Sequence, residues 1–100
     1  MNTEEIIITD NEFSRQFETT IEKQLATIEY AQQDRKIFLT KVMMPEVLKE
    51  KGYLDPFIEA VLEEIKERNT RVMPTSPEIV KFIRKNRRKY KNLLPVGINI

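Results

Sequence analysis

One stretch in the middle of the chain restricts the fold more than any other feature. Residues 37–43 are mostly apolar, as a central strand is, and residues 71–73 form a second, shorter strand-like run. Between them, Asp55-Pro56 is typical of a helix start, with a carboxylate that can cap free amides and a proline at the first helical position. Strand, helix and strand in this order predict a right-handed βαβ unit with two parallel strands.

The predicted helix after Asp55 and a second one after Ser76 both have an apolar face. Apolar residues recur at i, i+3 and i+4 in each, and Ser76-Pro77 repeats the combination of a cap and a proline. Acidic side chains line another face of the first helix, where we expect them to meet only solvent. The predicted core residues are Phe57, Ile58, Val61, Leu62, Ile65, Ile79, Phe82 and Ile83, and the acidic stripe is Glu59, Glu63 and Glu67.

The chain before residue 37 predicts an antiparallel meander. Glu5–Thr9 is a short β-branched run, residues 13–17 carry two aromatic rings four positions apart, and residues 26–30 alternate apolar and polar side chains. We therefore expect one α+β domain over residues 1–100. It would contain a twisted, mostly antiparallel sheet of about four or five strands, a parallel βαβ unit and two main helices.

The residue types limit both chemistry and location. The sequence has no cysteine and no histidine, which excludes disulfides, thiolate nucleophiles, imidazole bases and the usual zinc sites, so we expect no metal. No apolar run approaches the length of about 18 residues that crosses a bilayer. Because the N-terminus also lacks the features of a secretory signal, we expect a soluble, cytoplasmic protein without a membrane partner.

Charge is distributed unevenly, although the formal net charge is only +1. Residues 1–67 carry eight basic and fifteen acidic side chains, whereas residues 68–100 carry nine basic side chains and one acidic one. Within Arg84–Lys91 six of eight residues are basic, and Tyr90 stands among them. This basic segment is compatible with a solvated helix end, with a contact to cofactor phosphates or another acidic partner, or with a nucleic-acid surface on which Tyr90 stacks.

Several motifs resemble the small acetyltransferase-like proteins of the GNAT superfamily of N-acetyltransferases. Arg71–Arg84 is similar to the strand, Pro-x-Cys-Pro segment and amphipathic helix of that family, and Tyr90–Leu94 is similar to its closing Glu-Tyr-x-x-Leu motif. The resemblance extends over residues 17–94. It implies a GNAT-like fold and the transfer of an acetyl group from acetyl-CoA to an amine acceptor of unknown identity.

The resemblance also implies a cofactor site. Pro45–Gly52 resembles the loop that binds the pyrophosphate of coenzyme A, commonly Gln/Arg-x-x-Gly-x-Gly/Ala, with Lys49 at the Gln/Arg position. Such loops work because glycines let consecutive amides approach a phosphate at a helix N-terminus. Leu54 replaces the second small residue, so we expect weakened binding of acetyl-CoA. The implied cofactor-binding residues are Lys49, Glu50, Lys51, Gly52, Tyr53 and Leu54.

The catalytic residues are less clearly marked. Lys41-Val42 stands where relatives commonly have His-Thr, and Ser76 stands where many have cysteine. The catalytic candidates are Ser76, Thr40 and Tyr30, which could orient an amine or relay a proton. Each has a structural interpretation as well, Ser76 as a helix cap and the other two as strand formers. The alternative function is a non-catalytic GNAT-fold module that binds an acidic partner or nucleic acid through Arg84–Lys91.

Overall fold

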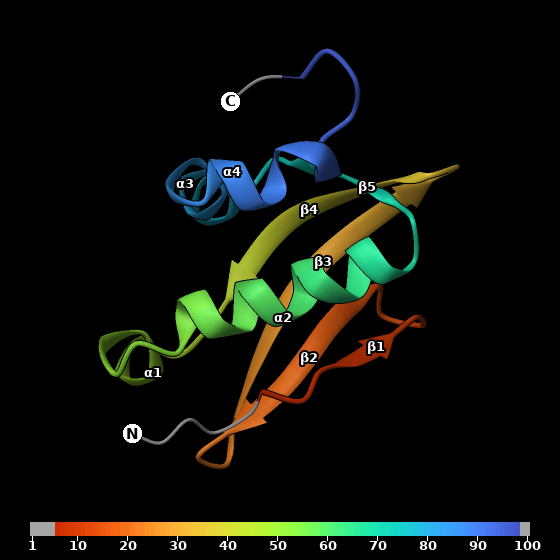
Figure 1. Cartoon of the computed structure of the whole chain (residues 1–100). Coiled ribbons are helices and arrows are strands. Elements are labelled where there is room, and N and C mark those ends of the chain that lie inside the picture. Colours follow the sequence, from red (N-terminus) through yellow and green to blue (C-terminus); the bar gives the residue numbers. More distant parts are fainter. Residues whose placement is uncertain (1–5, 99–100) are drawn as a thin grey trace.

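The sheet of the computed structural model, which describes residues 6–98, has five strands in chain order (Figure 1). Neighbouring strands from β1 to β4 pair antiparallel, whereas β5 pairs parallel with β4. This arrangement confirms the predicted α+β fold with its mostly antiparallel sheet and parallel βαβ unit. The strands are β1 (Thr9–Asn11), β2 (Gln16–Ile21), β3 (Gln24–Gln33), β4 (Lys36–Met43) and β5 (Arg71–Pro74).

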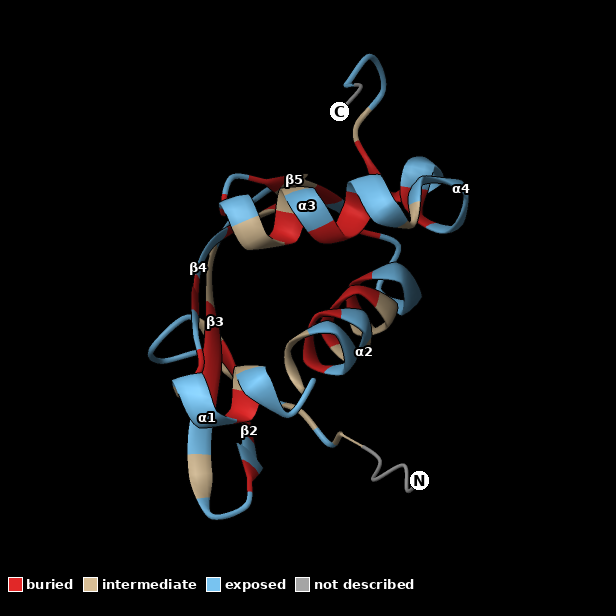
Figure 2. Ribbon diagram, turned by 90° about the vertical axis from the view of Figure 1, so that its left-hand side faces the viewer, coloured by how far each residue is buried: buried red, intermediate tan, exposed pale blue. Residues whose placement is uncertain are grey.

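The helices lie on one face of the sheet and beside its β5 edge. α2 crosses the face, and α3 lies along β5 (Figures 1 and 2). All eight core residues predicted for these two helices are buried. Within the described residues, no helix combines the length and apolar composition needed to cross a bilayer. The helices are α1 (Glu46–Glu50), α2 (Leu54–Glu67), α3 (Pro77–Lys85) and α4 (Arg87–Tyr90), followed by the 3-10 turn η1 (Lys91–Leu93).

The first two strands lie later in the chain than the sequence predicts. The first residue of Glu5–Thr9 lies outside the described residues, and only the last belongs to β1. The predicted strand over residues 13–17 is wrong for most of its length, since the amide of Ser14 donates to Oδ1 of Asn11 (3.0 Å) and closes a turn there. Phe13 is consequently 99% exposed. The predicted strands at residues 26–30 and 37–43 are confirmed as parts of β3 and β4.

β4 loses its β5 partner halfway along its length. The parallel pairing runs only as far as Leu39 and Pro74. Thr40 then forms a bulge, because Leu39 and Lys41 pair with consecutive residues of β3. Residues 40–43 continue as a strand, but within the described part of the chain no strand pairs with them on the β5 side. The sheet therefore opens at this point, between the end of β4 and α3.

Candidate functional site

The opening beside β4 is fixed by hydrogen bonds to a single carbonyl group. The amides of Thr75 and Ser76 both donate to the Leu39 carbonyl oxygen at 3.1 Å, and the Thr75 hydroxyl donates to the same oxygen at 3.0 Å. These bonds turn the chain from β5 into α3, whose first residue is Pro77. The turn takes the chain out of the sheet into α3, so no strand among residues 6–98 pairs with residues 40–43 on this side.

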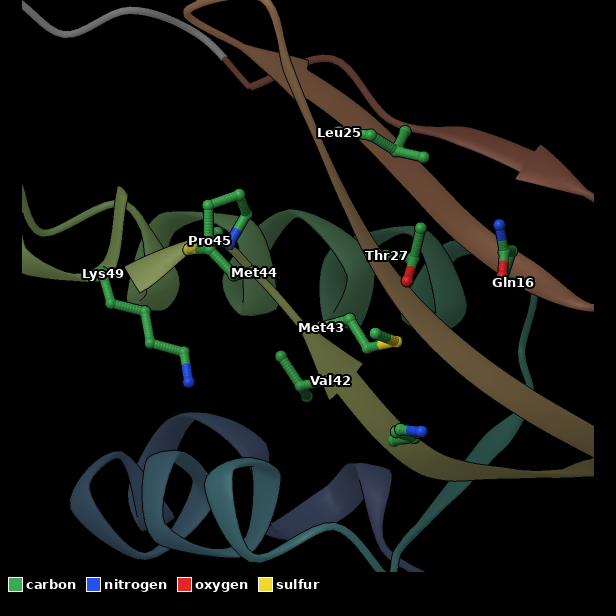
Figure 3. A pocket seen from close by; sticks show the side chains of 9 residues that line it. Gln16, Leu25, Thr27, Val42, Met43, Met44, Pro45 and Lys49 are labelled. Carbon is green, nitrogen blue, oxygen red and sulfur yellow. The ribbon is translucent and has the colours of Figure 1, made fainter. Parts of the chain in front are cut away.

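A pocket of about 670 Å³ borders this opening. In Figure 3, α2 lies behind the strands, the side chains that line the pocket lie in front of them, and Lys49 points from α1 toward α3. Pockets of this size hold small organic ligands, and a mainly apolar wall with a few polar groups is typical of them. The pocket is lined by Gln16, Leu25, Thr27, Lys41, Val42, Met43, Met44, Pro45 and Lys49.

The structure separates the two lysines of the predicted cofactor loop. Lys49 and Glu50 end α1, and Lys49 lines the pocket without entering any of the ion pairs among residues 6–98. The Lys51 ammonium instead lies 2.6 Å from the Glu22 carboxylate, which also accepts a bond from the Tyr53 hydroxyl at 3.3 Å. The Lys51 hydrogen bond lowers the pKa of Glu22 and raises the pKa of Lys51. Lys49 is thus the loop cation that remains available to a ligand in the pocket.

Most amides of this loop already have acceptors. Those of Lys51, Gly52 and Tyr53 donate to carbonyl groups of α1 at distances of 3.0 to 3.3 Å. Gly52 has a φ of +87°, a conformation that favours glycine, and it connects α1 to α2. The first-turn amides of Leu54 and Asp55 have no acceptor within α2, as at any helix start. The backbone can therefore offer an anion two amides at α2 rather than a continuous cradle.

Neither predicted cap makes the expected hydrogen bond. α2 begins at Leu54, and the Asp55 carboxylate contacts the Lys85 ammonium (3.1 Å) rather than a backbone amide. Ser76 does occupy the N-cap position of α3, but its hydroxyl donates to Glu78 (2.8 Å) and caps no amide. In both cases a charged side chain replaces the backbone as the partner.

The three catalytic candidates lie in different environments. Ser76 is buried, with 1% of its surface exposed, and Thr40 sits at the bulge, where its hydroxyl donates to the Glu29 carbonyl oxygen at 3.2 Å. Both border the opening beside β4. The Tyr30 hydroxyl donates instead to Oδ1 of Asp10 at 2.6 Å. Burial, followed by this hydrogen bond, raises the pKa of Tyr30 to about 12. The structure thus brings Thr40 and Ser76 to the opening and gives the Tyr30 hydroxyl a different partner.

The acidic stripe of α2 meets the basic segment. The Lys89 ammonium lies 2.8 Å from the Glu59 carboxylate and 3.8 Å from that of Glu63. The hydrogen bond to Glu59 raises the pKa of Lys89. The prediction that Glu59 and Glu63 face only solvent is therefore wrong, because α4 folds back against α2 and places an opposite charge beside them.

Tyr90 belongs to the core and not to an open surface. Only 1% of its area is exposed, and the centre of its ring lies 5.8 Å from the centre of the Phe82 ring. Its hydroxyl donates to the Glu63 carboxylate at 3.3 Å. A ring in this position cannot stack on a nucleic-acid base. The exposed cations of the segment with no ion pair among residues 6–98 include Arg84, Arg88 and Lys91.

Several residues that line the pocket were not identified from the sequence. Gln16, Leu25, Thr27 and Met43 come from three strands, and their convergence depends on the register of the sheet. The alternation within residues 26–30 does indicate that Thr27 points away from Ile28, but it does not show which side chains lie beside Thr27.

Comparison with known proteins identifies relatives of this chain. Residues 16–93 match the model of a family described as GCN5-related N-acetyl-transferase. Among solved structures, the chain resembles a GCN5-like candidate N-acetyltransferase from Staphylococcus aureus, determined by NMR in solution. The two share 19% sequence identity with a TM-score of 0.65, over 97% of this chain and 94% of that chain, a likeness of fold. A search of curated proteins found no match.

Proposed function

This chain belongs to the GCN5-related N-acetyltransferase family, and from that premise we propose that it transfers an acetyl group from acetyl-CoA to an amine. The opening beside β4 supports the proposal most directly, because a strand edge without a strand partner among residues 6–98, an adjacent pocket and the cation of Lys49 occur there together. Ligands of sheets with a parallel βαβ unit favour points where neighbouring strands diverge.

The residues at the opening offer the kinds of contact that acetyl-CoA can make. The cofactor has amide groups that can pair with the edge of residues 40–43, and phosphates that Lys49 and the first-turn amides of α2 can attract. One group opposes it, because the half-exposed Asp55 carboxylate lies at the same helix start. Lys85 neutralises that carboxylate only in part. We therefore expect a dissociation constant in the range of tens of micromolar or weaker, about −6 kcal/mol.

When bound, acetyl-CoA supplies an activated thioester, and the protein has to position the amine. The Thr40 hydroxyl donates its proton to the Glu29 carbonyl oxygen, so its lone pairs face outward and can accept a hydrogen bond from an amine. Ser76 has the same acceptor capacity but is buried. We propose that Thr40 orients the amine and that water accepts the proton that the amine releases. Positioning is then the main source of rate acceleration.

Calorimetric titration with acetyl-CoA tests the proposal, and the loop supplies a matched pair of variants. Lys49→Ala should weaken binding about tenfold, through the loss of one charge-assisted contact to phosphate. Lys51→Ala should leave binding nearly unchanged, because Glu22 already holds that ammonium. Equal losses in the two variants would contradict the assignment of the site, and sub-micromolar affinity of the unmodified protein would contradict the weakened loop.

A non-catalytic module that binds an acidic partner through the basic segment is the second proposal. The exposure of Arg84, Arg88 and Lys91 supports it, whereas the burial of Tyr90 excludes base stacking by that ring. Exposed cations offer contacts to phosphates but not to base edges, so oligonucleotide binding should fade steeply with salt and ignore sequence. Gel shifts with scrambled oligonucleotides at two salt concentrations test this. Salt-resistant, sequence-selective binding would favour the module over the enzyme.

A further inference from the structure

The pocket extends from the opening onto the face of the sheet opposite α2. The register places Thr27 of β3 directly opposite Met43 of β4, and Leu25 follows two residues away on the same face of β3. Leu25 and Met43 are 55% and 49% exposed, although both line the pocket. Two half-exposed apolar side chains on a pocket wall favour a ligand with an apolar group of its own.

The charges in the pocket are all positive. Lys41 and Lys49 line it, no carboxylate is among the lining residues, and none of the ion pairs among residues 6–98 involves Lys41. Glu29 pairs across the strands with Lys41 but lies outside the lining. The lining therefore attracts an anionic group and holds no carboxylate for a second cation.

The Glu18 carboxylate, also on this face, accepts hydrogen bonds from two neighbouring side chains. Glu18 pairs with Thr27 across the strands, and its Oε2 accepts hydrogen bonds from Asn11 at 2.9 Å and from Gln16 at 2.6 Å. The bonds from Gln16 and Asn11 lower the pKa of Glu18, so the group stays ionised. Both amides bind the same oxygen, so a cationic ligand would compete with them at Oε2 and could approach only through Oε1.

From this arrangement we infer that the acceptor is a small primary amine that also carries a carboxylate and an apolar side chain, as an aliphatic α-amino acid does. The carboxylate pairs with Lys41, the apolar group lies against Leu25 and Met43, and the amine faces the opening at Thr40. Lys49 remains for the cofactor phosphates. The inference rests on the proposed acetyltransferase function and names its substrate class. Polyamines and lysine-rich peptides are disfavoured, because their additional cations meet Lys41.

Three probes separate these chemical classes on the protein saturated with coenzyme A, which binds without turnover. L-Leucine carries all three groups, L-leucinamide lacks the carboxylate, and cadaverine replaces it with a second amine. We expect NMR titrations to show L-leucine binding about tenfold more tightly than L-leucinamide, with cadaverine weakest. Shifts caused by L-leucine should centre on Leu25, Thr27 and Lys41. Cadaverine binding as tightly as L-leucine would overturn the inference.

Lys41→Gln is the decisive variant, and Lys36→Gln in the same strand is its matched control. Lys41→Gln should abolish the preference for L-leucine over L-leucinamide, whereas Lys36→Gln, at the far end of β4, should retain it. An unchanged preference in Lys41→Gln would overturn the inference. Calorimetry with acetyl-CoA on the same proteins separates the two proposals. If coenzyme A binds and L-leucine does not, only the acceptor class is wrong, and if coenzyme A does not bind, the acetyltransferase proposal fails with it.

Discussion

Replacing Tyr90 tests whether the one ring in the basic segment is a core residue or stacks on a nucleic-acid base. Tyr90→Ala removes a side chain that is 1% exposed and packs 5.8 Å from the ring of Phe82. Truncation of a buried aromatic residue costs about 3 to 5 kcal/mol through lost transfer energy and the cavity left behind. Since domains of this size are stable by about 5 to 15 kcal/mol, the variant should lose a large share of its stability.

Tyr90→Phe separates the contribution of the ring from that of the hydroxyl. The bond from the Tyr90 hydroxyl to Glu63 is 3.3 Å long, longer than the usual range of about 2.5 to 3.0 Å, so its loss should cost only about 0.5 to 1 kcal/mol. The ring, its contact with Phe82 and the Lys89 ammonium 5.5 Å from its centre all remain. The difference between the two variants therefore measures the packing of the ring.

Urea denaturation followed by circular dichroism gives both free energies, with the m-value as a check on two-state behaviour. We expect Tyr90→Ala to be destabilised several times more than Tyr90→Phe. Oligonucleotide binding of Tyr90→Phe should be unchanged. If Tyr90→Ala were within about 1 kcal/mol of the unmodified protein and lost oligonucleotide binding, the burial of the ring would be wrong and the stacking role would be restored.

Three further predictions concern α2 and the sheet beneath it. Tyr30 has a pKa of about 12 in the folded chain against about 10 when unfolded, so its contribution to stability is complete below about pH 10 and is lost as pH rises toward about 12. In urea titrations at several pH values over this range, Tyr30→Phe should lose less unfolding free energy than the unmodified protein. An equal loss in the two proteins would refute the prediction. Val61 is fully buried, so Val61→Ala should cost about 2 kcal/mol in the same assay, and an unaffected midpoint would contradict its place in the core. Asp55→Ala should cost at most about 0.5 kcal/mol, because the loss of the half-exposed pair with Lys85 and of a favourable charge at the helix start is partly offset by the higher helix propensity of alanine, whereas a loss of about 1 kcal/mol or more would indicate a functional cap.

Local sequence patterns predicted the βαβ unit and its core because those features depend on residues near one another in the chain. The spacing of Phe57, Val61 and Ile65 defines the buried face of α2 without reference to any other element. The apolar run at residues 37–43 likewise indicates a strand, and Ile37, Leu39 and Val42 of that strand are buried. The turn closed by the hydrogen bond from Ser14 to Asn11, by contrast, was not predicted, because the two aromatic rings of residues 13–17 suggested a strand.

The partners of individual side chains depended on contacts between residues distant in sequence. Asp55 is a residue type that commonly caps helices, but its carboxylate binds Lys85, 30 residues away, instead of a backbone amide. Tyr90 stands in a basic run, yet the fold-back of α4 onto α2 buries it. The pocket depends on the strand register and on the bulge at Thr40, and neither leaves a clear pattern in a single sequence. The loop at Lys49 was found only through the family resemblance.

A mass-spectrometric assay of acetyl transfer tests directly whether the protein is an acetyltransferase. The protein is incubated with acetyl-CoA and, separately, with aliphatic amino acids, polyamines and peptides, and both the N-acetylated amine and free coenzyme A are quantified. If the chain is an acetyltransferase with the inferred acceptor class, the two products appear in equal amounts, depend on the protein and are most abundant with aliphatic amino acids. No N-acetylated product above the protein-free control with any acceptor would contradict it.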